Sequence, residues 1–304
     1  MRRTPKNRDA TPSLLDFFLI WRIDPIALAA LVVVGTLYGL GVATLARRGE
    51  AWPVIRTLGF YAAGLGSFAV ISFGFLGAYS TELRWAFTTR IALLLFAVPA
   101  LIGIGQPITL ARRALSETPL RITNAVLASW PVRLIGNAIF APLFALAAFC
   151  VFLTPLAGSL RESAVAENVL TLAVPLVGLL MVLPIIEHTT QRTSFFITAE
   201  FMLVFVELII DAIPAILMRL NDGVLDQLAP YAGLVPAWFP SALQDQHLAG
   251  DFLWFIAEVA DIPILILLFI RWSKIDRKEA KQLDELSDEE MDRLTREHLR
   301  ARPE

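Results

Sequence analysis

Apolar residues gather in seven long stretches, and polar residues are largely confined to the segments between them and to the two ends of the chain. Each stretch approaches the roughly 20 apolar residues that a helix needs to cross the hydrocarbon core of a bilayer. Because the runs are continuous and lack the two-residue alternation of a membrane barrel, they predict helices rather than strands. The pattern predicts an all-α fold, a polytopic membrane helix bundle with seven transmembrane helices. The stretches run from Ile26 to Ala46, Arg56 to Ala78, Phe87 to Leu110, Leu134 to Leu156, Ala166 to Ile186, Phe195 to Met218 and Phe252 to Trp272.

The segments on either side of the bundle differ from it in character. Residues 1–25 form a basic tail whose short apolar patch, from Leu14 to Trp21, is typical of an interfacial segment lying on the membrane surface. Residues 273–304 form a charged tail, in which Ser287 and Glu290 have the spacing of a helix capping box. We therefore expect a transmembrane domain over residues 26–272, followed by a cytoplasmic C-terminal helix in the tail.

Composition agrees with a membrane protein. The 304 residues are 56% hydrophobic and 18% charged, with a mean hydropathy of +0.63, whereas roughly a quarter of the residues in soluble domains are charged. The net charge of −2 gives no indication of a nucleic-acid partner. The single cysteine, Cys150, allows neither an intramolecular disulfide nor a CxxC motif.

Basic residues indicate the orientation of the helices. If the N-terminus lies outside, most arginines and lysines fall in cytoplasmic segments, as the positive-inside rule requires. We therefore expect the N-terminus outside and the C-terminus in the cytoplasm, with the loop from Asn221 to Asp251 as the longest outer connection. The residues on the inner side are Arg47, Arg48, Arg56, Arg112, Arg113, Arg121, Arg133, Arg192, Arg271, Lys274, Arg277, Lys278 and Lys281.

Four carboxylates interrupt the last two apolar stretches. Glu207 and Asp211 are four residues apart, and Glu258 and Asp261 are three apart, so each pair shares one face of its helix. Because these two helices run in opposite directions, Asp211 and Glu258 fall at a similar depth, and Arg90 in the third helix is the nearest obvious counter-charge. Two interpretations are open: an arginine–carboxylate cluster that holds the third, sixth and seventh helices together, and a proton relay or cation site.

The histidines do not form a shared metal site, because no two of the three can bind the same haem or metal ion in this topology. They are His188, His247 and His298. One alternative is a mixed site on the outer side, which combines His247 with carboxylates such as Asp211 or Glu258. In the simpler alternative, Asp245 or Asp251 caps a helix N-terminus.

Sequence motifs of enzymes are missing from the chain. It has no hydrolase serine elbow, no phosphate-binding loop and no HExxH zinc motif, and the last stretch has no lysine for a retinal Schiff base. The sequence therefore predicts a protein that is not an enzyme.

One block of sequence has a distinctive order of residues. It is Asp245-Gln246-His-Leu-Ala-Gly250-Asp-Phe-Leu-Trp254, followed by Glu258, Pro263, Trp272, Asp276, Ala280 and Asp284. This block resembles the last helix and tail of the CtaG family of cytochrome c oxidase assembly factors. Earlier residues agree in order with the start of that family's first helix and the end of its third, and they are Trp21, Asp24, Pro25, Pro99, Gly105, Pro107 and Leu110.

The resemblance implies a function for the protein. Members of that family are seven-helix proteins of the bacterial inner (plasma) membrane that help to mature the copper centre of a haem–copper oxidase, with copper handled toward the outer face. Copper is the metal that the resemblance suggests, and the sequence leaves the cofactor of this protein unidentified. The resemblance also implies a lipid bilayer environment and cytochrome c oxidase subunits or other membrane proteins as partners.

The residues that would bind copper differ from the family pattern. The third helix in that family usually carries two histidines four residues apart, and counting back from Pro99 places Phe87 and Ile91 at those positions. Glu167 and Asn168, and the sixth helix with its two carboxylates, also stand where related chains often have histidine. Hard oxygen ligands do not suit cuprous ion. The resemblance therefore predicts membership of the family but not its copper site.

Three functions follow from these observations. The leading hypothesis is a membrane assembly or accessory factor for cytochrome c oxidase. The alternative is a proton or cation transporter or channel that uses the intramembrane carboxylates. A third is a divergent relative that has lost metal chemistry and serves only as a structural partner.

Overall fold

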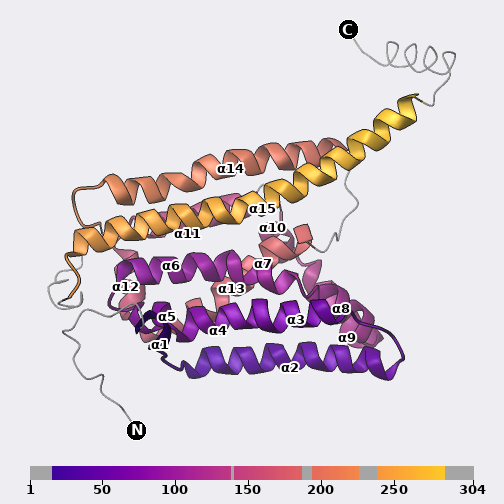
Figure 1. Cartoon of the computed structure of the whole chain (residues 1–304), viewed down its shortest axis with the longest axis horizontal. Coiled ribbons are helices and arrows are strands. Elements are labelled where there is room, and N and C mark those ends of the chain that lie inside the picture. Colours follow the sequence, from indigo (N-terminus) through magenta and orange to yellow (C-terminus); the bar gives the residue numbers. More distant parts are fainter. Residues whose placement is uncertain (1–15, 138–139, 187–193, 226–237, 285–304) are drawn as a thin grey trace.

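The computed structural model describes residues 16–137, 140–186, 194–225 and 238–284, which form helices and turns without a strand (Figure 1). The all-helical fold predicted from the sequence is confirmed. In chain order the helices are α1 (Asp16–Leu19), α2 (Pro25–Arg47), α3 (Val54–Leu58), the π-helix η1 (Gly59–Leu65), α4 (Gly66–Phe73), α5 (Phe75–Tyr79), α6 (Arg84–Leu95), α7 (Ala97–Gly103), α8 (Pro107–Ala114), α9 (Glu117–Leu127), α10 (Trp130–Ile135), α11 (Phe140–Val151), α12 (Leu156–Glu162), α13 (Ala164–Ile186), α14 (Ser194–Leu220) and α15 (Ala242–Asp284).

Several of these helices are long and apolar enough to cross a membrane. Among the described residues there are four, or five if α11 and α12, which meet at 76°, form one broken span. This is fewer than the seven predicted crossings. Helices α14 and α15 occupy the last two predicted stretches, but many of their side chains lie outside the described residues. The four are Pro25–Arg47, Val54–Tyr79, Arg84–Gly103 and Ala164–Leu183.

Two predicted stretches are interrupted where the backbone requires it. The third ends at Gly103 instead of continuing to Leu110, because Gln106 adopts a left-handed φ of 47° and Pro107 begins a new helix. The fourth breaks after Val151, because Pro155 has no N–H to continue the helical ladder, and a turn separates α11 from α12.

The connection predicted from Asn221 to Asp251 is shorter than expected. Helix α15 already begins at Ala242, where the Ser241 hydroxyl accepts a hydrogen bond from the N–H of Gln244 at 3.1 Å. The helix then continues past the end of the last predicted stretch to Asp284. The predicted capping box at Ser287 lies outside the described residues.

Helix α2 begins with a local cap and runs along the outside of the bundle. The Asp24 carboxylate accepts hydrogen bonds from the N–H groups of Ile26 at 2.8 Å and Ala27 at 3.3 Å, and Pro25 occupies the first turn. Only 17% of its apolar window is buried, and Val32, Val33 and Leu37 are exposed. Such a surface is typical of a helix that faces lipid.

Helices α6 and α7 lie at the centre of the molecule. Their combined span, Arg84–Gly103, is 78% buried. One apolar cluster packs α6 against α5, α11 and α15, and a second packs α7 against α2, η1 and α4. On α13, a Cβ at Gly178 would lie 2.6 Å from Cγ of Pro99, so glycine is required for α13 to approach α7 closely.

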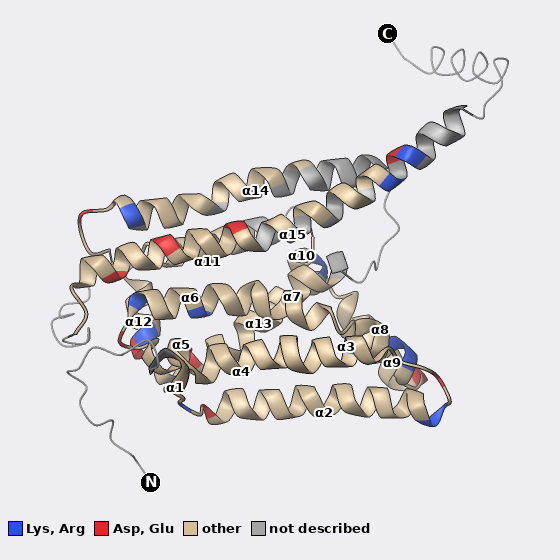
Figure 2. Cartoon of the chain, in the orientation of Figure 1, with Lys and Arg blue, Asp and Glu red and all other residues tan. Residues whose placement is uncertain are grey.

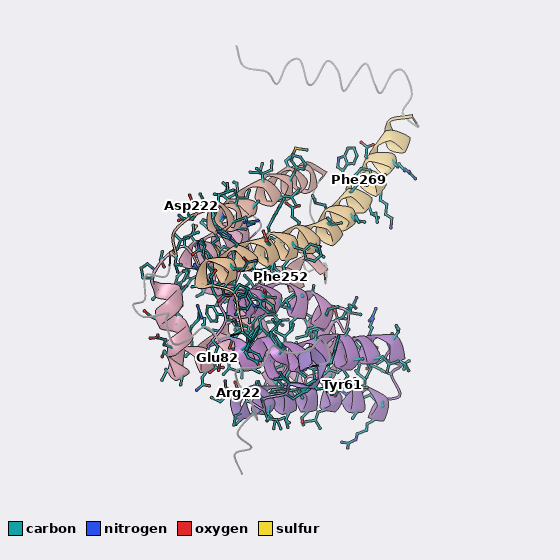
Figure 3. The ribbon with its side chains drawn as sticks, turned by 60° about the vertical axis from the view of Figure 1, so that its left-hand side comes forward. Arg22, Tyr61, Glu82, Asp222, Phe252 and Phe269 are labelled. Carbon is teal, nitrogen blue, oxygen red and sulfur yellow. The ribbon has the colours of Figure 1, made fainter. Side chains whose placement is uncertain are left out.

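Helices α14 and α15 form an antiparallel pair along one side of the bundle (Figure 1). With 43 residues, α15 is about 65 Å long at the ordinary helical rise, roughly twice the thickness of a bilayer core. Figures 1 and 3 show that its C-terminal half, which carries Phe269, extends past the ends of its neighbours, whereas Phe252 lies beside the bundle.

Candidate functional site

The first turn of α6 is capped by a residue far away in the sequence. Leu83, at the N-cap position, makes no side-chain hydrogen bond to the helix. The Asp245 carboxylate accepts hydrogen bonds instead from the N–H groups of Arg84 at 2.7 Å and Trp85 at 2.8 Å. Burial raises the pKa of the Asp245 carboxyl, whereas these two N–H groups lower it. Because a helix N-terminus carries partial positive charge, the buried carboxylate is stabilised there and ties α15 to α6.

The Arg84 side chain extends this contact to a third helix. It is 2% exposed and donates one hydrogen bond to Oε1 of Gln246 at 2.6 Å and another to the backbone carbonyl of Phe152. Phe152 follows the last residue of α11, where helical carbonyls have no partner within their own helix. The guanidinium group therefore caps the C-terminal end of α11.

Gln246 connects the end of α14 to the same place. Its side-chain oxygen also accepts a hydrogen bond from the N–H of Leu225 at 2.8 Å, while its nitrogen donates to the carbonyls of Met218 at 3.2 Å and Gly223 at 3.0 Å. Arg84, Asp245 and Gln246, which we call the capping cluster, thus satisfy backbone groups of α6, α11 and α14 from a buried position.

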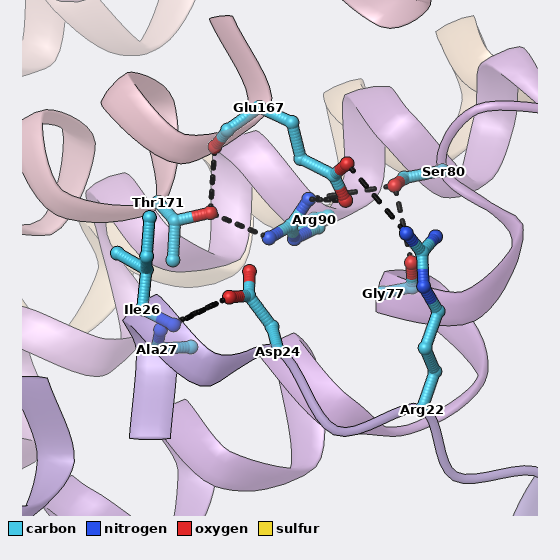
Figure 4. A network of polar contacts seen from close by, with 9 residues as sticks. All are labelled: Arg22, Asp24, Ile26, Ala27, Gly77, Ser80, Arg90, Glu167 and Thr171. Atoms are coloured by element: carbon cyan, nitrogen blue, oxygen red, sulfur yellow. Dashed lines mark hydrogen bonds and ion pairs between the residues drawn. The ribbon is translucent and has the colours of Figure 1, made fainter. Parts of the chain in front are cut away.

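A second buried guanidinium group lies further along α6 (Figure 4). Arg90 is 2% exposed and donates hydrogen bonds to the hydroxyls of Thr171 at 2.7 Å and Ser80 at 3.4 Å. It also forms an ion pair with Glu167 on α13, with 3.6 Å between Nη1 and Oε1. We call these four residues the Arg90 network.

The Arg90 network reaches the protein surface through Glu167. This side chain is 22% exposed and lies 4.0 Å from Arg22, which is itself largely exposed. Thr171 donates its hydroxyl hydrogen to the carbonyl of Glu167 at 2.7 Å and accepts from Arg90, so its position in the network is fixed. The network therefore holds α5, α6 and α13 together. The carboxylate of Glu167 remains partly exposed at the protein surface.

The predicted intramembrane cluster is described only in part. The side chains of Glu207, Asp211 and Asp261 lie outside the described residues, so their meeting remains a prediction. Arg90 was expected to face them, but its described ion pair is with α13. Glu258 is half-buried and accepts a hydrogen bond from Nε1 of Trp254 at 2.9 Å.

The residues in the block of sequence that begins at Asp245 have different structural roles. Gly250 allows α15 to approach α14, because a Cβ there would lie 2.6 Å from the carbonyl oxygen of Ala215. Asp251 forms an ion pair with Arg219 at 3.1 Å, and a ring nitrogen of His247 lies 3.2 Å from the carbonyl oxygen of Asn221. Trp254 is half exposed, and Trp272 packs its ring 6.0 Å from that of Phe269.

The positions where the family would place copper-binding histidines do not fit a metal ion. Phe87 and Ile91 are 4% and 6% exposed and pack in the apolar core, where Phe87 meets the ring of Phe152 edge-on at 6.0 Å. Neither side chain has a lone pair to donate. Within the described ranges, no group of three or more His, Cys, Asp or Glu residues could hold a metal ion.

The sequence reveals some of these polar residues and not others. Arg90 stands out because it lies inside an apolar stretch, whereas Arg84 precedes the third predicted stretch and gives no such signal. Two features of the sequence signal the capping cluster. Leu83, at the N-cap position of α6, has no polar side chain, and Asp245 has no lysine or arginine close to it in sequence. Such a long-range pairing cannot be assigned from one sequence alone.

Replacing Asp245 with alanine tests the capping cluster. The change leaves two buried N–H groups of α6 without an acceptor, so we expect the free energy of unfolding to fall by about 2 to 4 kcal/mol. Denaturant unfolding of the protein purified in detergent measures it. His247→Ala is the matched control two positions away and should change stability by less than about 0.5 kcal/mol. Equal effects of the two substitutions would contradict the capping assignment.

Replacing Glu167 with glutamine tests the Arg90 network. The substitution leaves the Arg90 guanidinium buried without its counter-charge, and we expect a loss of about 1 to 3 kcal/mol. The control is Arg22→Gln, which removes only the exposed partner and should be close to neutral. Thermal unfolding measures the stability of both variants. A larger loss of stability for Arg22→Gln than for Glu167→Gln would contradict the assignment of Glu167 as the counter-charge of Arg90.

Comparison with other proteins places the chain in a family. An uncharacterized protein of Mycobacterium bovis is 25% identical over 285 residues, and one of Mycobacterium leprae is 24% identical over 289 residues. Each alignment covers 91% of this chain and 43% of the relative, so the chain spans less than half the length of these curated relatives. No solved structure matches the chain. Residues 36–274 match the cytochrome c oxidase caa3 assembly factor family (Caa3_CtaG), and the protein belongs to that family.

Proposed function

We propose that the protein is a membrane accessory factor in the assembly of cytochrome c oxidase. The family match over residues 36–274 carries this proposal. Membership of an assembly-factor family implies a non-catalytic role and association with the oxidase or with other membrane proteins. The lipid-facing helices, the connection between α14 and α15, and the charged tail are the parts we propose to contact the oxidase.

The proposed topology has seven crossings of a bacterial-type plasma membrane, with the N-terminus outside and the C-terminus in the cytoplasm. The alternating directions of α2, the α3–α5 segment, the α6–α7 segment, α11, α13, α14 and α15 support it (Figure 1). In Figure 2, basic residues gather where α2, α8 and α9 meet, as expected for a cytoplasmic end. Residues 1–25 would be an outer tail, in which the exposed Phe18, Leu19 and Trp21 suit the membrane surface.

We propose that this protein supports oxidase assembly as a scaffold rather than as a copper carrier. The support is the apolar packing of Phe87 and Ile91, together with the use of the polar residues on α6 to join helices. If copper-centre maturation is nonetheless direct, His247, Asp211 and Glu258 are the ligands to test. Copper would then be a cargo bound near the outer side.

A transporter or channel is the second candidate. The observation that favours it is Glu258, a half-buried carboxylate on an otherwise apolar helix face with exposed Phe255, Val259 and Ile262. Ionisable residues in membrane helices often mark ion pathways. In this alternative Glu258 would work with Glu207, Asp211 and Asp261 in one polar layer.

Deleting the gene separates the two candidates. An assembly factor predicts loss of most of the oxidase haem signal and activity, with recovery on expression of the wild-type chain. Reduced-minus-oxidised spectra and the copper content of the purified oxidase measure this. A normal oxidase together with altered proton or cation uptake would reject the assembly role and favour transport.

Reversing the charge of Glu258 tests its depth in the membrane. We expect Glu258→Lys to reduce accumulation in the membrane, since a lysine at the centre of a span costs about 2.5 to 3.5 kcal/mol on insertion scales. Asp276→Lys is the matched control on the same helix, at an exposed position beyond the predicted span. Immunoblots of membrane fractions compare the two, and equal abundance would place Glu258 outside the hydrocarbon region.

A further inference from the structure

The segment from α8 to α10 is attached to the bundle at the end where α2 terminates. Arg48 at the end of α2 donates a hydrogen bond to the carbonyl of Arg113 at 2.9 Å, and Arg113 forms an ion pair with Glu50 at 2.7 Å. Leu110 is buried against α2, where a Cβ at Gly41 would lie 3.1 Å from its Cγ. Helix α8 is therefore level with the end of a membrane-crossing helix, and α9 follows it after two residues.

Helix α9 has three different faces. At 100° per residue, Leu120, Thr123 and Leu127 share one side, and all three are half-buried against the protein. Ile122 and Val126 share the adjacent side and are 63% and 56% exposed. Exposure of this apolar side to water would be energetically unfavourable.

The third face of α9 is polar and lies opposite the exposed apolar side. Asn124 is exposed there, about 160° from both Ile122 and Val126. Arg121 is also exposed and lies at the edge of this face, about 100° from Ile122 and about 140° from Val126. Trp130, at the start of α10, is a second exposed apolar side chain in this segment and is 75% exposed. A helix beside a membrane-crossing bundle with apolar and polar sides opposed is the pattern of an interfacial amphipathic helix.

The charges of the segment from α8 to α10 indicate which kind of surface it binds. Arg112, Arg121 and Arg133 are exposed, whereas the acidic residues nearby are Glu117 and Glu50, and the latter is paired with Arg113. Arginines at the edge of an apolar surface complement anionic lipid headgroups, and tryptophan favours the level of the headgroups. We propose that α9 and α10 lie in the plane of an anionic leaflet, with Ile122, Val126 and Trp130 among the acyl chains and Arg112, Arg121 and Arg133 on phospholipid headgroups.

Site-directed spin labelling tests the placement in the membrane. In a Cys150→Ser background, a nitroxide is attached at Ile122→Cys or at Asn124→Cys, on opposite sides of α9. The protein is reconstituted in phosphatidylcholine containing about one third phosphatidylglycerol, a mixture with the negative surface potential that the proposal requires. The label at position 122 should be accessible to oxygen and shielded from a water-soluble nickel chelate, and the label at 124 should show the reverse. Equal accessibility to the chelate at both positions would overturn the proposal.

Lipid retention tests the arginines. Native mass spectrometry of the detergent-purified chain compares phosphatidylglycerol with phosphatidylcholine. The triple variant Arg112→Gln, Arg121→Gln and Arg133→Gln should bind phosphatidylglycerol more weakly by about fivefold for each arginine removed. Arg219→Gln, an exposed arginine at the other end of the bundle, is the control and should bind as the wild type does. Unchanged selectivity in the triple variant would overturn the proposal, as would shielding of position 122 that appears only when the oxidase is added.

Discussion

Helix ends that are buried inside a membrane protein need hydrogen-bond partners, and in this protein one cluster of three side chains supplies them. Asp245 satisfies the first N–H groups of α6, Arg84 satisfies a carbonyl at the end of α11, and Gln246 satisfies groups at the end of α14. An unsatisfied backbone group in such surroundings costs on the order of several kcal/mol. The relative placement of four helices therefore depends on this cluster.

Helix α6 carries several polar residues within the apolar interior, and each buried charge on it has partners on neighbouring helices. Its two buried guanidinium groups point to different neighbours, Arg84 to α11 and α15 and Arg90 to α13. The block of sequence that resembles the family thus has two parts with different roles. Asp245, Gln246 and Gly250 fasten α15 to the bundle, while Trp254 and Glu258 lie on its exposed side, where a partner could reach them.

Local signals in the sequence predict much of the fold. Asp24 and Pro25 mark the start of α2, and the long apolar runs give the helical class and the positions of the four candidate membrane spans among the described residues. Breaks within a run are harder to see, because Gln106 and the turn before Pro155 interrupt helices whose hydrophobicity continues. The predicted outer loop is too long since Ser241 begins α15 early.

Long-range pairing is the part that a single sequence does not reveal. Arg90 was identified as a buried charge, but its partner Glu167 is 77 positions away in a segment without other acids in the same run. Asp245 and Arg84 are likewise distant in sequence, with a separation of 161. Amphipathic helix α9 was missed because it lies between two apolar stretches and is too short to show a clear period.

A double-mutant cycle between Arg84 and Gln246 tests the central claim most directly. Denaturant unfolding is measured for Arg84→Met, Gln246→Leu, the double variant and the wild type. If the cluster holds α6, α11, α14 and α15 together through mutual hydrogen bonds, the double variant loses less stability than the sum of the single variants, with a coupling of about 1 to 3 kcal/mol. Additive losses, within about 0.5 kcal/mol, would contradict the account.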